Sequence, residues 1–519
     1  MKVIASVALS LLAATSGGAA SLDDYSAMVT GNGVLELAET RQLTFASDGK
    51  VSDVSISPDG RSVVYATSTD STISIGLVKT TGGKPTVLLA TPSGISSVDI
   101  TTVTADKPVW VIGGSPVWSP NGKYIAFPAS QMAREGEVVS QKPFLILLTN
   151  RGAQEAAIPA PETARSVAPL FSPDSTKVLW LDEVWRPVGG SDGRDLFVLD
   201  IERRTCTLIY SAPVFRARWS PDGASVLLWT TKANSDGLRT YLRVRLDGTQ
   251  EETGEWKVAR IDPRSPDGKF EVVRQEPGLA VKEVATGRVL PLTAVRTSTC
   301  RGWLPASRDF CYTENLVAKN DENGRSREFC TLWLANVEAP KLNTMLVARD
   351  YVGGWPSWSN DGLRIAYVVD GTVHVAILTR RDATPREKVR AGLPVTREEE
   401  LQVMMENGKT IGNALAMFAA DWDDNLPTAD YSQRLWEEHG HDLGATAEEA
   451  LRPYLGSLGN RDAFLRPGTQ DVIFRFLDPG VAKLTDIERP SETVIGELDA
   501  GDGLVIQIFA DGHVTMKQR

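Results

Sequence analysis

The sequence predicts a mainly β fold, a seven-bladed β-propeller, followed by a small α+β domain. Three observations predict it. A Ser-Pro-Asp-Gly turn motif recurs between residues 57 and 362 at intervals of roughly 40 to 60 residues, the spacing of propeller blades. Each copy is followed by β-rich runs that amount to about four strands. From Asp382 onward, helical spacing and acidic residues replace this pattern.

The turn motif has six well-formed copies and one degenerate copy. Apolar β-forming residues flank each copy, as expected of a hairpin turn between two strands. The degenerate copy is Gly302-Trp303-Leu304-Pro305. The motif residues of the other six are Ser57, Pro58, Asp59, Gly60, Ser119, Pro120, Asn121, Gly122, Ser172, Pro173, Asp174, Ser220, Pro221, Asp222, Gly223, Ser265, Pro266, Asp267, Gly268, Ser359, Asp361 and Gly362.

Each motif position has a physical reason. Proline presets φ for a tight turn, Asp or Asn bonds back to the backbone, and Gly accepts the left-handed conformation that ends the loop. The Asp residues are therefore interpreted as turn residues, not as a ring of catalytic carboxylates. The aromatic residue before Ser is expected to pack between neighbouring blades, and a ligand platform is the alternative. These aromatic residues are Trp118, Phe171, Trp219 and Trp358.

The ends of the repeat region predict how the ring closes. The last repeat ends near residues 373–378 and lacks an outer strand, whereas residues 40–44 form a spare strand near the start. We expect this spare strand to complete the last blade, which removes two exposed edges. A six-bladed propeller, with residues 300–347 as an insertion, is the alternative.

The repeated Ser-Pro-Asp-Gly-Lys/Arg unit with a following apolar strand resembles the repeat of the TolB-like, WD-like propellers. The resemblance covers residues 34–380. It implies a propeller and, in the periplasmic relatives, contact with other proteins through the central face. It implies no single activity, because propellers have many functions.

The N-terminus predicts export. Lys2 precedes an apolar run over residues 3–14, and Gly18-Ala19-Ala20 supplies small residues before Ser21. Residues 1–20 are therefore expected to be a cleaved signal peptide, which places the protein in the periplasm or outside the cell. The net charge of −11 argues against a nucleic-acid partner. No later apolar run is long enough to span a membrane. The protein is expected to be a monomer.

The acidic C-terminal segment predicts a second domain. It holds 14 Lys and Arg against 24 Asp and Glu from Pro385 to the end, a net charge of −10. Residues 381–395 are expected to be a linker. Thr396 and Glu399 predict a capping box at the start of a helix of about 20 residues. A short helix near residues 445–455 and strands near 472–476, 493–496 and 505–509 follow.

Residues 396–519 resemble the prepilin-like, or pseudopilin-like, proteins of unknown function. The resemblance rests on residues 407–418, on Leu426-Pro427 and on the terminal Phe509-Ala510-Asp511-Gly512-His513. Those proteins begin with a cleaved apolar helix, which the propeller replaces here, so a docking module is expected and not a pilus subunit. The His that the family places ten residues before Asp511 is Gly501.

Catalytic and metal candidates are few. Gly189-Gly190-Ser191-Asp192-Gly193 matches a nucleophile motif, but no helix pattern follows it, as a nucleophile elbow requires. His439 and His441 could bind a transition metal through their imidazoles, and a solvated loop is the preferred interpretation.

One acidic segment imitates a calcium loop. Asp421, Asp423 and Asn425 have the spacing of its first ligands, but Leu426 stands where Gly is needed and Ser432 where an acid is needed. A turn that ends a helix is the preferred interpretation. No cofactor is expected, and calcium is the alternative.

Four cysteines are present: Cys206, Cys300, Cys311 and Cys330. If residues 302–307 form a hairpin turn, Cys300 and Cys311 are expected to lie opposite each other across two strands. Cys311 and Cys330 are the alternative pair in the next hairpin.

Two functions compete. The first is an exported, non-catalytic binding or scaffold protein that presents a propeller surface to a protein or glycan of the cell envelope, with an accessory docking domain. The second is an exported hydrolase or lyase with its active site at the central face of the propeller. The sequence lacks a recognisable nucleophile, base or metal signature, which favours the first.

Overall fold

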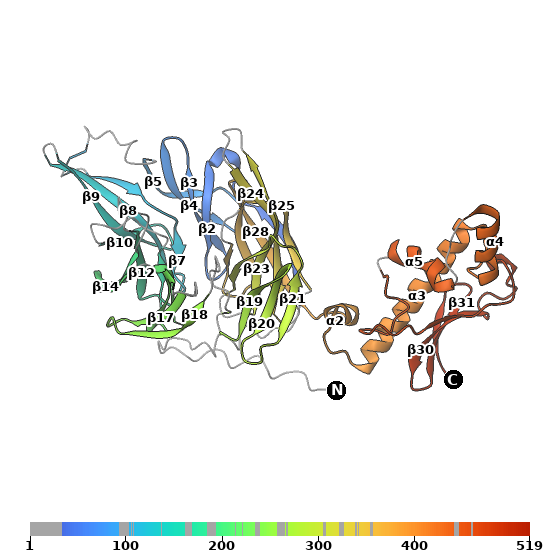
Figure 1. Cartoon of the computed structure of the whole chain (residues 1–519). Coiled ribbons are helices and arrows are strands. Elements are labelled where there is room, and N and C mark those ends of the chain that lie inside the picture. Colours follow the sequence, from blue (N-terminus) through green and yellow to red (C-terminus); the bar gives the residue numbers. More distant parts are fainter. Residues whose placement is uncertain are drawn as a thin grey trace, which may run out of the picture. The chain divides into compact units, whose positions relative to one another are not determined.

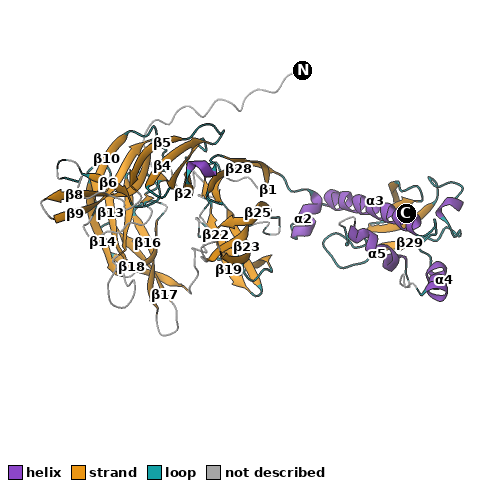
Figure 2. Cartoon of the chain, turned by 90° about the horizontal axis from the view of Figure 1, so that it is seen from above, coloured by secondary structure: helices purple, strands orange, loops and turns teal. Residues whose placement is uncertain are grey.

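The computed structural model describes residues 34–92, 103–104, 106, 108–135, 138–160, 169–183, 194–212, 214–220, 222–233, 239–256, 265, 268–304, 308–320, 326–337, 340, 342–352, 356–440, 446–457 and 460–519. The chain divides into two compact units, Met1–Arg381 and Asp382–Arg519. The first is built from antiparallel strands, and the second holds the α-helices (Figures 1 and 2). The expected signal peptide, the Gly189–Gly193 motif, Pro221, Pro266, Asp267 and His441 lie outside the described residues.

The described strands of the first unit form seven blades, as predicted. Blades 1 to 4 are β2(Lys50–Ile56), β3(Ser62–Ser68), β4(Thr72–Lys79) and β5(Thr86–Pro92); β6(Val109–Ile112), β7(Val117–Trp118), β8(Tyr124–Glu135), β9(Val138–Thr149) and β10(Gln154–Pro159); β11(Leu170–Phe171), β12(Lys177–Glu183), β13(Arg194–Asp200) and β14(Thr205–Ala212); and β15(Val214–Trp219), β16(Ser225–Ala233), β17(Arg239–Arg245) and β18(Gln250–Trp256). Blades 5 to 7 are β19(Phe270–Gln275), β20(Gly278–Glu283) and β21(Val289–Thr293); β22(Thr299–Trp303), β23(Asp309–Asn320), β24(Ser326–Asn336) and β25(Thr344–Val352); and β26(Ser357–Trp358), β27(Arg364–Val369), β28(Thr372–Arg381) and β1(Val34–Gln42).

Two blades depart from four regular strands. In blade 2, β6 and β7 both pair with β8, so they are two pieces of one interrupted inner strand. In blade 5 the structure describes three strands, and residues 257–264, which precede its turn, lie outside the described part. Blades 6 and 7 belong to one eight-stranded sheet, because Tyr351 at the end of β25 pairs with Val369 of β27.

The first strand of the propeller completes its last blade. β1 runs antiparallel to β28, with Thr40 opposite Ala376 and Gln42 opposite His374. Just beyond β1, the Val373 N–H donates to the buried Thr44 Oγ1 at 2.9 Å. The predicted closure is confirmed, and β1 covers the edge that β28 would otherwise expose.

Aromatic residues of the motif pack between blades. Trp219 of β15 lies in a buried cluster with Leu179 and Leu196 of blade 3, and its indole N–H donates to the Leu170 carbonyl at 2.9 Å. Trp358 of β26 lies in a cluster shared by blades 6 and 7. The expected packing role of these two residues is confirmed.

The cysteine register differs from expectation. Gly302, not Cys300, lies opposite Cys311, because a β-bulge between Cys300 and Gly302 shifts the pairing of β22 with β23. Cys311 pairs with Leu334 on its other side, so Cys330 is not its cross-strand neighbour either. None of the four cysteines, all of which lie in the described residues, forms a disulfide.

The second unit is a helix packed on a small sheet. Its strands are β29(Phe474–Phe476), β30(Val494–Gly501), β31(Leu504–Phe509) and β32(Val514–Gln518), in that order. The helix α3(Arg397–Asp421) has the predicted capping box of Thr396 and Glu399. It buries Met404, Ile411 and Phe418 in a core that also contains sheet residues.

Two glycines explain how closely α3 approaches the sheet. A Cβ added to Gly408 would lie 3.0 Å from Val514 Cγ1, and one added to Gly412 would lie 3.2 Å from the Gly512 carbonyl oxygen. The helix backbone therefore rests directly on β31 and β32, and larger residues would push it away.

Two helices of this unit depart from the sequence expectation. The helix α4(Ala429–His439) was not expected, although Thr428 caps it. The helix α2(Pro385–Ala391) occupies the segment expected to be a linker. It forms because Thr384 and Glu387 make a second capping box, Pro385 occupies the first turn, and Gly392 ends it with φ 72°. The expected short helix is α5(Ala447–Ser457).

Candidate functional site: the turn ring and the arginine pocket

Two regions of the described structure have the features of a binding surface. The first is the row of motif turns on the propeller, which we call the turn ring and define as the turns that begin at Ser57, Ser119, Ser172, Ser220, Ser265 and Ser359, together with Leu304. The second is a pocket in the C-terminal unit that four arginines line.

In five of the turns, the motif serine donates a hydrogen bond to the Asp or Asn two residues later. In the first, Ser57 Oγ donates to Asp59 Oδ1 at 2.6 Å and accepts from the Ser62 N–H at 2.9 Å. Asp59 Oδ1 also accepts from the Arg61 N–H at 3.0 Å. Ser119 and Asn121 repeat this pattern in blade 2. The Asp side chains are therefore committed to the turns.

The carboxylate pKa values agree with this role. Burial alone would raise the pKa of Asp59 and Asp174, but the hydrogen bonds from Ser57 and Ser172 and from the backbone outweigh it and lower both pKa values. For Asp222, the hydrogen bond from Ser220 is the largest cause of its lowered pKa.

Neighbouring turns contact one another from blade 6 through blade 7 to blade 4. The Asn360 N–H donates to the Pro58 carbonyl at 2.9 Å, and the Asn121 N–H donates to Ser175 Oγ at 3.0 Å. Three further pairs of turns lie close together. A Cβ added to Gly362 would lie 2.8 Å from Leu304 Cδ2, one added to Gly122 would lie 3.8 Å from Pro58 Cδ, and one added to Gly223 would lie 3.6 Å from Pro173 Cδ. The motif turns thus form one continuous surface along these blades.

One position of each turn faces solvent. The residue after the motif Gly, or after Ser175 in blade 3, is exposed in five of the described turns, whereas the motif Ser is buried. These exposed residues are Arg61, Lys123, Thr176, Ala224 and Lys269. In the turn ring, hydrogen bonds hold the backbone of the turns, whereas the exposed side chains at this position differ in chemistry from blade to blade.

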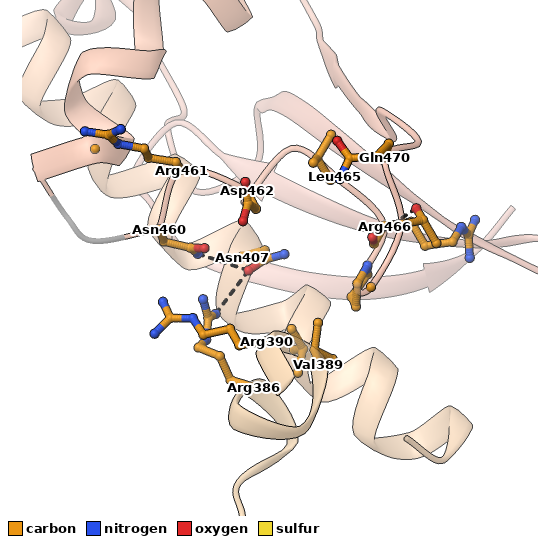
Figure 3. Close-up of a pocket in the computed structure, with 15 residues that line it drawn as sticks. Arg386, Val389, Arg390, Asn407, Asn460, Arg461, Asp462, Leu465, Arg466 and Gln470 are labelled. Carbon is orange, nitrogen blue, oxygen red and sulfur yellow. Dashed lines mark hydrogen bonds between the residues drawn. The ribbon is translucent and has the colours of Figure 1, made fainter. Parts of the chain in front are cut away.

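The arginine pocket has a volume of about 480 Å³ and lies wholly within the C-terminal unit. Its charged lining residues are Arg386, Arg390, Arg461, Arg466 and Asp462, and Figure 3 shows them around Asn407 and Asn460. The charged residues come from α2 and from the loop after α5, and Asn407 comes from α3. The net charge of the C-terminal segment does not reveal this site, because the segment is acidic overall. The four arginines lie in two segments that are far apart in the sequence.

The acidic turn at the end of α3 is a helix terminus. Asp421 is the last residue of α3, and Asp423 and Asp424 have φ values of 51° and 62°. The Asn425 side-chain N–H donates to the Trp422 carbonyl at 2.8 Å. These contacts fit the turn interpretation.

The structure places His439 at the end of α4. Among the described residues, no group of three or more His, Cys, Asp and Glu side chains is arranged to hold a metal ion. Within the same residues, no helix is long and apolar enough to cross a membrane.

Comparison with known proteins adds similarity at the level of the fold. No family model and no curated protein matches the chain. TolB from Acinetobacter baumannii is 16% identical over 66% of each chain, with a TM-score of 0.30. Oligogalacturonate lyase from Vibrio parahaemolyticus is 11% identical over 67% of this chain and 92% of that one, with a TM-score of 0.37.

The C-terminal WD40 domain of Sif2 is 12% identical over 67% of this chain and 99% of that one, with a TM-score of 0.36. At these identities and TM-scores, none of the three carries an argument about activity. The strand pairing described above establishes the propeller.

Proposed function

We propose that this protein is an exported, non-catalytic binding protein of the cell envelope. Its propeller presents the turn ring to a protein or glycan partner, and its C-terminal unit is an accessory recognition module. The observation that carries this proposal is the continuous row of turn contacts from blade 6 to blade 4. A surface whose backbone is fixed before binding loses little conformational entropy when a partner docks.

The chemistry of the turns supports binding in preference to catalysis. One carboxylate oxygen of Asp59, Asp174 and Asp222 accepts a hydrogen bond from the motif serine of its own turn, so these side chains are held within the turns. The thiol of Cys206 has its pKa raised to about 11 by burial, and burial also raises that of Cys311. A nucleophilic thiol needs a lowered pKa.

Site-specific photo-crosslinking tests the proposal. A photoreactive amino acid is placed at Arg61, Lys123 or Thr176 in the turn ring, and at Val87 and Leu208 on outer strands as matched exposed controls. We expect a discrete crosslinked product from the turn-ring positions in cells that make the protein. Equal labelling from the outer-strand controls, or no product from any turn position, contradicts the proposal.

A second assay addresses the hydrolase or lyase alternative. The purified chain is incubated with envelope polysaccharides, and new reducing ends or unsaturated products are measured. Turnover of a polysaccharide would replace the binding proposal with the enzymatic one.

A further inference from the structure

The side-chain amide of Asn407 faces the arginine pocket with its donor group. Asn407 is 4% exposed, and its Oδ1 accepts hydrogen bonds from Arg386 Nη2 and Asn460 Nδ2, both at 3.0 Å. These two bonds define which atom of the amide is the oxygen. The nitrogen is therefore turned away from them and into the pocket, and no described residue accepts a hydrogen bond from it (Figure 3).

The arginines around Asn407 are positioned by acids that do not line the pocket. Arg386 Nε donates to Glu406 at 2.9 Å, and Arg466 Nη1 donates to Glu400 at 3.3 Å. Arg461 is exposed at the pocket wall, and no ion pair of its guanidinium occurs in the described part of the chain. Against these cations, Asp462 is the one carboxylate among the lining residues.

The pocket rim is a closed turn and not an open strand. The Arg466 N–H donates to the Asp471 carbonyl at 2.9 Å, and the Thr469 N–H donates back to the Arg466 carbonyl at 3.0 Å. Gly468 supplies the positive φ of 77° that this turn needs. Ligand-binding pockets are usually formed before the ligand arrives, and this rim has that property.

We propose that the arginine pocket binds an oxyanion group, a carboxylate or a phosphate, carried by a ligand of about the size of a sugar or an amino acid. The donor of Asn407 and the guanidinium groups of Arg386 and Arg390, which lie on the same side of the pocket in Figure 3, supply the charge-assisted hydrogen bonds that such a group accepts. The pocket lining holds four arginines and one carboxylate in a domain of net charge −10, so an anion that enters the pocket meets a locally positive surface. The proposal rests on the recognition role of the C-terminal unit and names the group recognised.

Calorimetry on the full-length chain tests the proposal with defined probes. Inorganic phosphate represents the phosphate source, D-glucuronate and L-glutamate represent carboxylates, and D-glucose is the uncharged control. We expect saturable binding of at least one oxyanion, a higher melting temperature in its presence, and weaker binding at high salt. Glucose is expected not to bind.

Two variants locate the site. Asn407→Asp keeps the acceptor for Arg386 and Asn460 but replaces the donor with a repelling oxygen, so affinity is expected to fall at least about tenfold. Arg390→Gln is expected to lower the affinity as well, and because Arg390 is exposed its replacement is not expected to disturb folding. Arg452→Gln, exposed on α5 and outside the pocket lining, is the matched control and is expected to bind normally.

The outcomes distinguish this proposal from the binding role of the propeller. If no oxyanion binds, or if Asn407→Asp and Arg390→Gln bind as well as the unchanged chain, the pocket proposal is wrong. Crosslinks from the turn ring would then leave the proposed function intact. If oxyanions bind but the turn ring gives no crosslink, the pocket proposal stands without the propeller role.

Discussion

Arg380 of β28 donates to the buried carboxylate of Asp309, with Nη2 at 2.6 Å from Oδ2. The Asp309 side chain is 2% exposed, and its other oxygen accepts from Asn336 Nδ2 at 2.7 Å. The pair joins Asp309, the first residue of β23 in blade 6, to β28 in blade 7. Because a buried carboxylate without a partner is strongly unfavourable, this contact ties the two blades together.

Removing one partner is expected to destabilise the propeller. Arg380→Met removes the cation that contacts the buried Asp309 carboxylate, and we expect a loss of about 3 kcal/mol in the free energy of unfolding. The double variant Asp309→Asn with Arg380→Met removes both charges and is expected to recover part of that loss. Urea unfolding followed by tryptophan fluorescence measures both. A single variant as stable as the unchanged chain would show that the pair is energetically neutral.

The closure of the ring predicts a second effect. Thr44→Val removes the acceptor of the buried Val373 N–H, which leaves that donor unsatisfied and costs about 1–3 kcal/mol. Thr86→Val, on the exposed outer strand β5, is the matched control and is expected to change little. Calorimetric melting compares the two. Deletion of residues 21–45 is expected to lower the melting temperature further, and an unchanged melt would contradict the closing role of β1.

Replacement of a motif serine is expected to lower the stability of the propeller more than the small size of the side chain suggests. Ser119 is fully buried, donates to Asn121 and accepts from the Tyr124 N–H at 2.9 Å. Ser119→Ala therefore breaks both bonds and is expected to cost about 1–3 kcal/mol by chemical denaturation. Ser74→Ala, on strand β4 and without a motif turn, is the comparison. Equal costs at the two positions would mean that the motif serine has no special role.

His374 predicts how stability changes with pH. Burial lowers its pKa below the ordinary 6.5, and its Nε2 lies 2.9 Å from Thr372 Oγ1 while its ring stacks on Tyr367. The folded state therefore holds the proton less tightly than the unfolded state. The free energy of unfolding should therefore be highest above pH 6.5. It should fall as the pH drops from 6.5 through the pKa that His374 has in the folded state.

His374→Gln isolates this effect. The variant cannot take up a proton, so its stability should vary less between pH 7 and pH 5 than that of the unchanged chain. Denaturation midpoints at several pH values measure the difference. Identical pH profiles for both proteins would exclude His374 as the cause.

The helix α2 predicts where the C-terminal unit begins. A fragment of residues 382–519 retains the ion pairs of Arg386 with Glu406 and of Lys388 with Glu399. A fragment of residues 396–519 loses both pairs and the part of the pocket lining that α2 supplies. We expect the longer fragment to melt at a higher temperature. Equal melting temperatures of the two fragments would indicate that residues 381–395 act as a linker.

The sequence predicts features that depend on neighbouring residues and on repetition. The turns were predictable because each Ser-Pro-Asp-Gly copy carries its own hydrogen bonds. The pairing of residues 40–44 near His374 was predictable because one blade had a strand too few. The bulge at Cys300 was not, because Gly302 was interpreted as part of the hairpin turn and not as the glycine of a bulge within β22.

The arginine pocket was hidden for a different reason. Asn407 and Asn460 meet across 53 residues of chain, and only the packing of α2, α3 and the loop after α5 brings them together. Asn407 was noticed as part of a family resemblance, but its neighbours in the sequence give no sign of its partners in space.

The pairing of β1 with β28 also determines the order in which the propeller can mature. The strand made first, residues 34–42, pairs with residues 374–381, which leave the ribosome roughly 340 residues later. Until then β1 has no partner, and blade 7 keeps an open edge that another chain can occupy. Completion of the propeller is therefore a late event that requires the whole repeat region. Truncated chains are expected to remain prone to association through that edge.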